Sequence, residues 1–216
     1  MYSIKLICTH HSNAGKCNSR ELNRLLEEKC PNVIFEDLSP AVHKECYEKD
    51  RFTMESEAIK MYLKNYSAEI IPAVGTEIGK VFLEKCKINE SHSGCKRLLG
   101  RLYGFAYFYG FDYLNSEYVH QLFDVLARLE QDIMGFIKDE EVNKIYKQAY
   151  ENIDKYENDI VENIYKYSAE NEYKRGVLLI DSAHRKSMIE KIEEYNDAQS
   201  LKLNWTFYDR GYCFPS

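Results

Sequence analysis

Polar side chains that suit acid–base or metal chemistry follow several predicted strands at the point where each strand ends. These groups are Thr9-His10-His11 after residues 3–8, Glu36-Asp37 after residues 33–35, and Asp181-Ser182-Ala183-His184 after residues 176–180. The carboxyl ends of neighbouring parallel strands meet at one edge of a sheet, where α/β proteins bind their ligands. We therefore expect His11, Glu36 and His184 to converge there. Glu77, after a third apolar segment at 70–74, is a weaker acidic candidate.

His184 also falls in the first turn of a predicted helix. The positive end of the helix dipole disfavours an imidazolium, so we expect the pKa of His184 to be lowered. A neutral imidazole can accept a proton or bind a metal ion near neutral pH. Glu36 suits a metal ligand, a base or a partner that orients a histidine. A His/carboxylate set of His11, Glu36 and His184, with Glu77 as a further ligand, would accept zinc, manganese or iron.

The two ends of the chain must supply the sheet that positions these residues. Residues 3–8 and 33–35 read as short buried strands, and between them a helix from Asn18 or Ser19 carries Leu22, Leu25 and Leu26 on one face. Strand, helix and strand predict a parallel βαβ unit. Near the C-terminus a strand at 176–180, a helix at 183–196 and a strand at 201–208 repeat the pattern.

The middle of the chain, residues 78–171, is helical in pattern throughout. Its last helix carries apolar residues from Val142 to Tyr167 at steps of three and four, which predicts a nearly straight stripe along a helix about 45 Å long. That stripe must lie on a neighbouring helix or on a second subunit. We expect an α/β fold with a mainly parallel sheet, and a single domain over 1–216 in which 78–171 is a helical insertion.

Composition narrows the possible partners and location. The 216 residues carry a net charge of −6, which argues against a general nucleic-acid binder, and no apolar run suits a membrane helix. The N-terminus does not read as a signal peptide. Seven cysteines, an odd number without a CxxC pair, are typical of reduced thiols. We expect a cytoplasmic protein that binds neither nucleic acid nor membrane.

The ordered segments resemble a known family. Cys8-Thr9-His10-His11, then Val33-Ile34-Phe35-Glu36, and late in the chain Asp181-Ser182-Ala183-His184 are similar to the pattern of TraB/TIKI-like proteins, which are related to erythromycin-esterase-like and ChaN-like proteins. That pattern is GxxH after the first strand, a glutamate ending the second, and a second GxxH. The resemblance implies an α/β fold with a helical insert and, in some members, metal-dependent peptide hydrolysis. Cys8 and Asp181 stand where the family has glycine.

Other residues favour structural readings. His10 should point away from His11 if the strand continues, and His43, His92 and His120 lie in polar or helical surroundings that predict surface positions. Cys8 falls within a buried strand and reads as core. The aromatic run at 97–113 is more typical of a packing surface than of a ligand cage.

The leading hypothesis is a hydrolase of an amide or ester bond with a small-molecule or peptide substrate and His11, Glu36 and His184 at its site. In one mechanism these residues hold a divalent metal that activates water. In the other a histidine acts as general base and Glu36 orients it. The alternative hypothesis is a non-enzymatic binding or interaction module that forms a homodimer through its insert helices.

Overall fold

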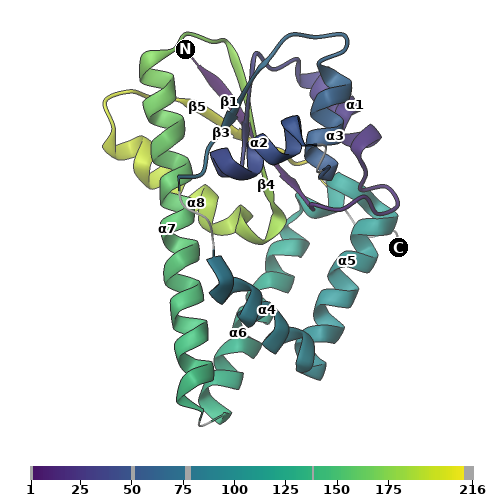
Figure 1. Cartoon of the computed structure of the whole chain (residues 1–216), viewed down its shortest axis with the longest axis vertical. Helices are drawn as coiled ribbons and strands as arrows, with labels where there is room; N and C mark the ends of the chain where they lie inside the picture. Colours follow the sequence, from purple (N-terminus) through teal and green to yellow (C-terminus); the bar gives the residue numbers. More distant parts are fainter. Residues whose placement is uncertain (1, 50–51, 76–78, 138, 212–216) are drawn as a thin grey trace.

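The computed structural model describes residues 2–49, 52–75, 79–137 and 139–211, and it shows a sheet with helices on both faces and a helical part beyond one sheet edge (Figure 1). The strands are β1 (Ser3–Thr9), β2 (Val33–Glu36), β3 (Glu69–Pro72), β4 (Arg175–Asp181) and β5 (Asn204–Phe207). The helices are α1 (Ser19–Lys29), α2 (Pro40–Glu48), α3 (Met54–Tyr62), α4 (Gly79–Ser91), α5 (Ser93–Leu114), α6 (Glu117–Phe136), α7 (Glu140–Glu170) and α8 (Arg185–Ala198). A 3₁₀ turn at Ser182–His184 leads into α8.

The sheet is parallel throughout the described residues, in the order β3-β2-β4-β1-β5. The predicted α/β fold with a parallel sheet from the two ends of the chain is therefore confirmed. Pro72 ends β3, which lies at the sheet margin, where the missing N–H of proline is tolerated. Because all strands run the same way, their carboxyl ends share one edge, and that edge faces the helices α4 to α7 (Figure 1).

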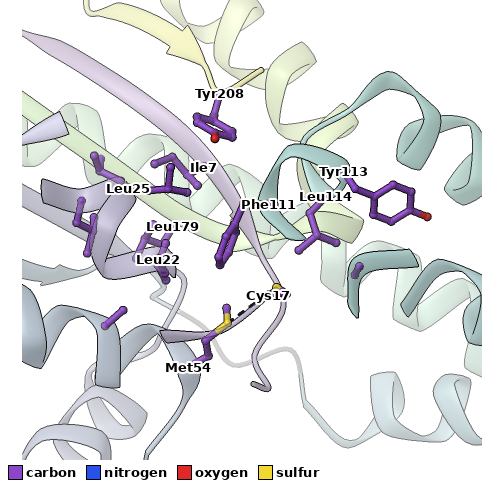
Figure 2. Close-up of a cluster of buried hydrophobic side chains, with 14 of the residues drawn as sticks. Ile7, Cys17, Leu22, Leu25, Met54, Phe111, Tyr113, Leu114, Leu179 and Tyr208 are labelled. Carbon is purple, nitrogen blue, oxygen red and sulfur yellow. Dashed lines mark hydrogen bonds between the residues drawn. The ribbon is translucent and has the colours of Figure 1, made fainter. Parts of the chain in front are cut away.

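Each face of the sheet has its own apolar core. Side chains of α1, α3 and the end of α5 pack on one face, with Leu22 and Phe111 against Ile7 and Leu179 (Figure 2). The other face, which carries the intervening strand residues such as Leu178, packs against α7 and α8. Full burial of each such leucine contributes about 2 kcal/mol, so both layers hold the strands in place.

A buried asparagine continues the sheet's hydrogen bonding where the outer strand stops. β5 pairs with β1 only as far as Leu6, which leaves the Cys8 backbone without a strand on that side. Asn115 accepts a hydrogen bond from the Cys8 N–H at 2.7 Å and donates one to the Cys8 carbonyl at 3.0 Å. Asn115 also caps the C-terminus of α5, and Ser116 is the N-cap of α6.

The predicted insertion at 78–171 corresponds to helices α4 to α7, which run from Gly79 to Glu170. The 31-residue helix α7 is the longest of them and spans about 46 Å. Its apolar stripe packs on its own chain: Ile160 and Ile164 belong to the core of the sheet, and Tyr146 packs with residues of α5 and α6. The stripe therefore gives no support to a homodimer, which stays a prediction. None of the helices in the described part of the chain has the length and apolarity needed to span a bilayer.

Candidate active site at the carboxyl edge of the sheet

The two histidines of the predicted site lie beyond adjacent strand ends. Thr9 and Asp181 are partners in the parallel pairing of β1 with β4, and His11 and His184 follow these positions by two and three residues. Desolvation opposes the charged form of both imidazoles, but Asp37 and Glu55 raise the pKa of His11, and Glu157 raises the pKa of His184. The negative charges of Asp37 and Asp181 contribute at both histidines. The same two carboxylates therefore act on both histidines, as the edge geometry requires.

His11 forms an ion pair with a carboxylate that the sequence analysis did not single out. Its Nδ1 lies 3.3 Å from Oε1 of Glu55, which is buried at the start of α3, whereas the His11 side chain is about half exposed. Desolvation works against the imidazolium, yet Asp37 and Glu55 outweigh it and raise the pKa of His11. His11 is thus a partly exposed cation beside the buried carboxylate of Glu55.

Glu36 does not join the two histidines. Its carboxylate accepts hydrogen bonds from Tyr47 at 3.0 Å and contacts His43 Nδ1 at 3.1 Å, and both of these residues belong to α2. The next residue, Asp37, reaches the edge instead: its carboxylate accepts the backbone N–H of Asp181 at 3.0 Å. Burial raises the pKa of Asp37 to about 6, although His11 acts in the opposite direction.

His184 is held by a carboxylate from the helical insertion. Its Nδ1 lies 2.8 Å from Oε1 of Glu157 on α7, and Ser187 Oγ donates to the same oxygen at 2.7 Å. Burial disfavours the imidazolium, but the hydrogen bond and the charge of Glu157 raise the pKa of His184 above its usual value. The lowered pKa expected from the helix dipole is therefore wrong, because a contacting buried carboxylate acts more strongly than a helix terminus.

The position of Glu157 in the sequence already indicates that it is buried. It stands four residues after Ile153 and three before Ile160, so it lies on the apolar stripe of α7. An ionisable residue at such a position is buried when the stripe is buried, and it then needs a partner. The structure buries Glu157 almost completely and supplies His184 and Ser187.

A cavity of about 670 Å³ lies between the sheet edge and the insertion. His184, Glu157, Ser182 and Ser187 line one side of it, and residues of α4, α5, α6, α7 and α8 supply the rest of the wall. Phe82, Leu99, Phe123, Leu126 and Ile153 give that wall a large apolar component. The volume lies in the range of small-molecule sites, which combine apolar walls with a few placed polar groups.

A buried polar network closes the far wall of this cavity. Glu130 of α6 lies 3.1 Å from Lys85 Nζ of α4, and it also accepts hydrogen bonds from Asn89 and from Tyr150 of α7. Tyr146 donates to the Asn89 side-chain oxygen at 2.8 Å. The network joins three helices of the insertion through one carboxylate, and Lys85 also lies over the Tyr150 ring.

The structure corrects one of the three histidines assigned to the surface. His92 is exposed, and His43 is partly exposed beside Glu36. His120 is buried instead, with Nε2 2.9 Å from a guanidinium nitrogen of Arg185. Its polar helical neighbours in sequence gave no hint of this contact, because Arg185 is 65 residues away.

The other structural readings hold in part. Cys8 is fully buried, and burial raises the pKa of its thiol far above the usual value, so it is core. His10 lies over the ring of Tyr103 at 4.5 Å between centroids. Within the aromatic run, Tyr113 is core but Phe108 is 61% exposed, so the run packs on one side only.

The described residues do not present a metal centre. No group of three or more His, Cys, Asp or Glu residues in that part of the chain is placed to hold one ion. His11, Glu36 and His184 each face a different partner, so this set does not fit a single-ion site, and we derive no step through a metal. Glu77 lies outside the described residues.

The geometry defines an α/β protein with a parallel sheet and a cavity at its carboxyl edge. Comparison with family models, curated proteins and solved structures found no match to the chain. The TraB/TIKI-like resemblance therefore stays a prediction from short motifs, of which His11 and His184 lie at the edge and Glu36 lies beside α2.

Proposed function

We propose that this protein is a hydrolase of an amide or ester bond in a small molecule or peptide that binds in the cavity. The observation that carries the proposal is the 2.8 Å contact between His184 Nδ1 and Glu157 in the wall of a 670 Å³ cavity. A histidine fixed at one ring nitrogen by a carboxylate directs its other nitrogen at a reacting proton. Ser187 restricts Glu157 further by donating to the same carboxylate oxygen.

In the proposed reaction, the Nε2 atom of neutral His184 takes a proton from water as the water oxygen attacks the substrate carbonyl carbon. The tetrahedral intermediate then loses its alcohol or amine, which receives the proton from His184, and the carboxylic acid is released. Glu157 stabilises the imidazolium that forms between these steps. Because the pKa of His184 is raised, the base form grows as pH rises through that pKa, and the rate should rise with it.

The test is a panel of chromogenic esters and amides assayed with the whole chain from pH 5 to 10. His184→Gln should lower kcat/KM by about 100-fold or more, the usual contribution of a general base. Glu157→Gln should lower it less and move the rising limb of the pH profile to lower pH. His92→Gln is the matched control, because His92 is exposed and does not line the cavity.

Equal activity of His184→Gln, His92→Gln and wild type would refute the proposal, as would the absence of hydrolysis across the panel. In the second case the chain would be better described as a small-ligand-binding module. The metal-dependent mechanism is a separate prediction, and metal analysis of wild type, His11→Ala and His184→Ala tests it.

We also propose a cytoplasmic location, supported by the six described cysteines, all of which are free thiols.

A further inference from the structure

The charged side chains around the cavity are not balanced. Among the described residues, seven carboxylates and three lysines line it. Each lysine is already paired with one of these carboxylates: Lys85 with Glu130 at 3.1 Å, Lys186 with Asp124 at 2.9 Å, and Lys191 with Asp154. The wall therefore offers no unpaired ammonium group to an anionic ligand.

Three of the remaining carboxylates stand at the rim. Glu90 of α4 and Glu190 and Glu194 of α8 line the cavity and are exposed. Within the described residues no lysine, arginine or histidine forms an ion pair with any of these three. The fourth carboxylate that is not paired with a lysine, Glu157, is paired with His184. Their fields add at the cavity mouth, where low-dielectric walls reduce screening by solvent.

A buried hydroxyl provides an independent sign of a ligand. Ser182 is 2% exposed and lines the cavity, yet its Oγ has no hydrogen-bond partner among the described residues. A buried hydroxyl normally has a partner, since leaving it unpaired costs about 1–3 kcal/mol. A ligand N–H group that donates to Ser182 Oγ would satisfy it.

We infer that the substrate is a cationic compound, an amine attached to an apolar body, whose ammonium group binds among the cavity carboxylates. The inference rests on the proposed function, because it names the substrate class of the same site. The apolar wall formed by residues such as Phe82 and Phe123 accommodates the body of the molecule. Aromatic faces also favour a neighbouring cation over an anion. The same charge balance disfavours acidic and phosphorylated substrates.

The test measures binding rather than turnover, by calorimetric titration of the whole chain with three probes of one shape. These are 3-phenylpropylammonium, 3-phenylpropan-1-ol and 3-phenylpropanoate. The ammonium probe should bind about tenfold more tightly than the alcohol, and the carboxylate should bind most weakly. Added salt should weaken binding of the ammonium, strengthen binding of the carboxylate and leave the alcohol unchanged. His184→Gln should keep this order of affinities, so a failed hydrolase proposal and a failed charge preference give different results.

Variants locate the preference in the cavity. The double substitution Glu190→Gln and Glu194→Gln should lower affinity for the ammonium probe about threefold or more and leave affinity for the alcohol unchanged. Ser182→Ala should also lower the affinity for the ammonium probe. Glu193→Gln is the matched control, because Glu193 is exposed on the same helix but does not line the cavity. Equal affinity for the three probes, no detectable binding of the ammonium probe, or an equal effect of Glu193→Gln would overturn the inference.

Discussion

The Glu130 carboxylate should stabilise the insertion, and Glu130→Gln tests this. Glu130 is 2% exposed and accepts from Lys85, Asn89 and Tyr150, so the substitution removes one charge and at least one acceptor position. Breaking a fully buried ion pair costs about 3–5 kcal/mol, because the remaining charge has no partner. Lys85 lines the cavity and is 9% exposed, so water can reach it in part. We therefore expect a loss of about 2–3 kcal/mol in the free energy of unfolding.

Equilibrium unfolding in urea, followed by circular dichroism, measures this loss. With an m-value of about 2 kcal/mol/M, the midpoint should fall by about 1 M. Adding Lys85→Met to Glu130→Gln removes the charge that was left unpaired, so the double variant should recover at least half of the loss. Asp132→Asn is the control, since Asp132 is exposed on the same helix and should change stability by less than about 0.5 kcal/mol. A Glu130→Gln variant as stable as the control, or a double variant with additive losses, would refute the reasoning.

Two further predictions concern the pair at the site and the backbone of α5. The raised pKa of His184 stabilises the fold below its unfolded pKa of about 6.5, and this stabilisation is lost as pH rises through the folded pKa. The stability gap between wild type and Glu157→Gln in urea unfolding should therefore be largest near pH 6 and shrink at alkaline pH; a constant gap would contradict it. Gly110 has φ +67° and a Cβ there would lie 2.9 Å from a backbone oxygen, so Gly110→Ala should lower the thermal midpoint by several degrees. Gly104, within the same helix, has open space around it, so Gly104→Ala should raise the midpoint slightly, and the opposite order of the two variants would contradict this account.

The architecture was predictable because it depends on local patterns that repeat. Short apolar segments at the two ends and apolar residues at steps of three and four in the middle specify the strands and helices. A helix that joins two strands returns the chain to the end of the sheet where the first strand began, which makes the strands parallel. The helix α2 was absent from the sequence analysis, although Ser39 and Pro40 form a good helix start. Its nine residues carry only Cys46 as a buried side chain, so it lacks the apolar pattern used to find helices.

The site was predictable only as far as the strand ends. Ligands of α/β proteins bind at the carboxyl ends of parallel strands, and this rule placed His11 and His184 at the edge where the structure has them. The rule depends only on where β1 and β4 end. It could not choose between Glu36 and Asp37, because neighbouring residues at a strand end point in different directions. The choice depends on α2, because its His43 and Tyr47 contact the Glu36 carboxylate. Asp37 is then the carboxylate that reaches the edge.

The partners of the two histidines lay beyond sequence reasoning for a related reason. Glu55 follows His11 by 44 residues, and Glu157 precedes His184 by 27, so neither pair is visible in a local window. The magnitudes also explain the wrong direction for the His184 pKa. A helix terminus is worth about 0.3–1 kcal/mol, whereas a buried hydrogen bond to a charged group is worth about 1.5–3 kcal/mol. A local rule is overturned whenever folding brings a stronger long-range partner into contact.

The insertion does two physical tasks at once, and this ties the stability of the fold to the site. A parallel sheet by itself leaves its carboxyl edge open to water, where a His–carboxylate contact is weakened by solvent. Here α7 crosses from the core of the sheet to the far wall of the cavity, and it supplies Glu157 to His184 and Tyr150 to Glu130. A substitution that loosens the Glu130 network should therefore also change the orientation of His184, although the two groups share no contact. If Glu130→Gln lowers stability yet leaves the pH dependence of the proposed hydrolysis unchanged, the contacts that α7 makes through Tyr150 and through Glu157 are independent.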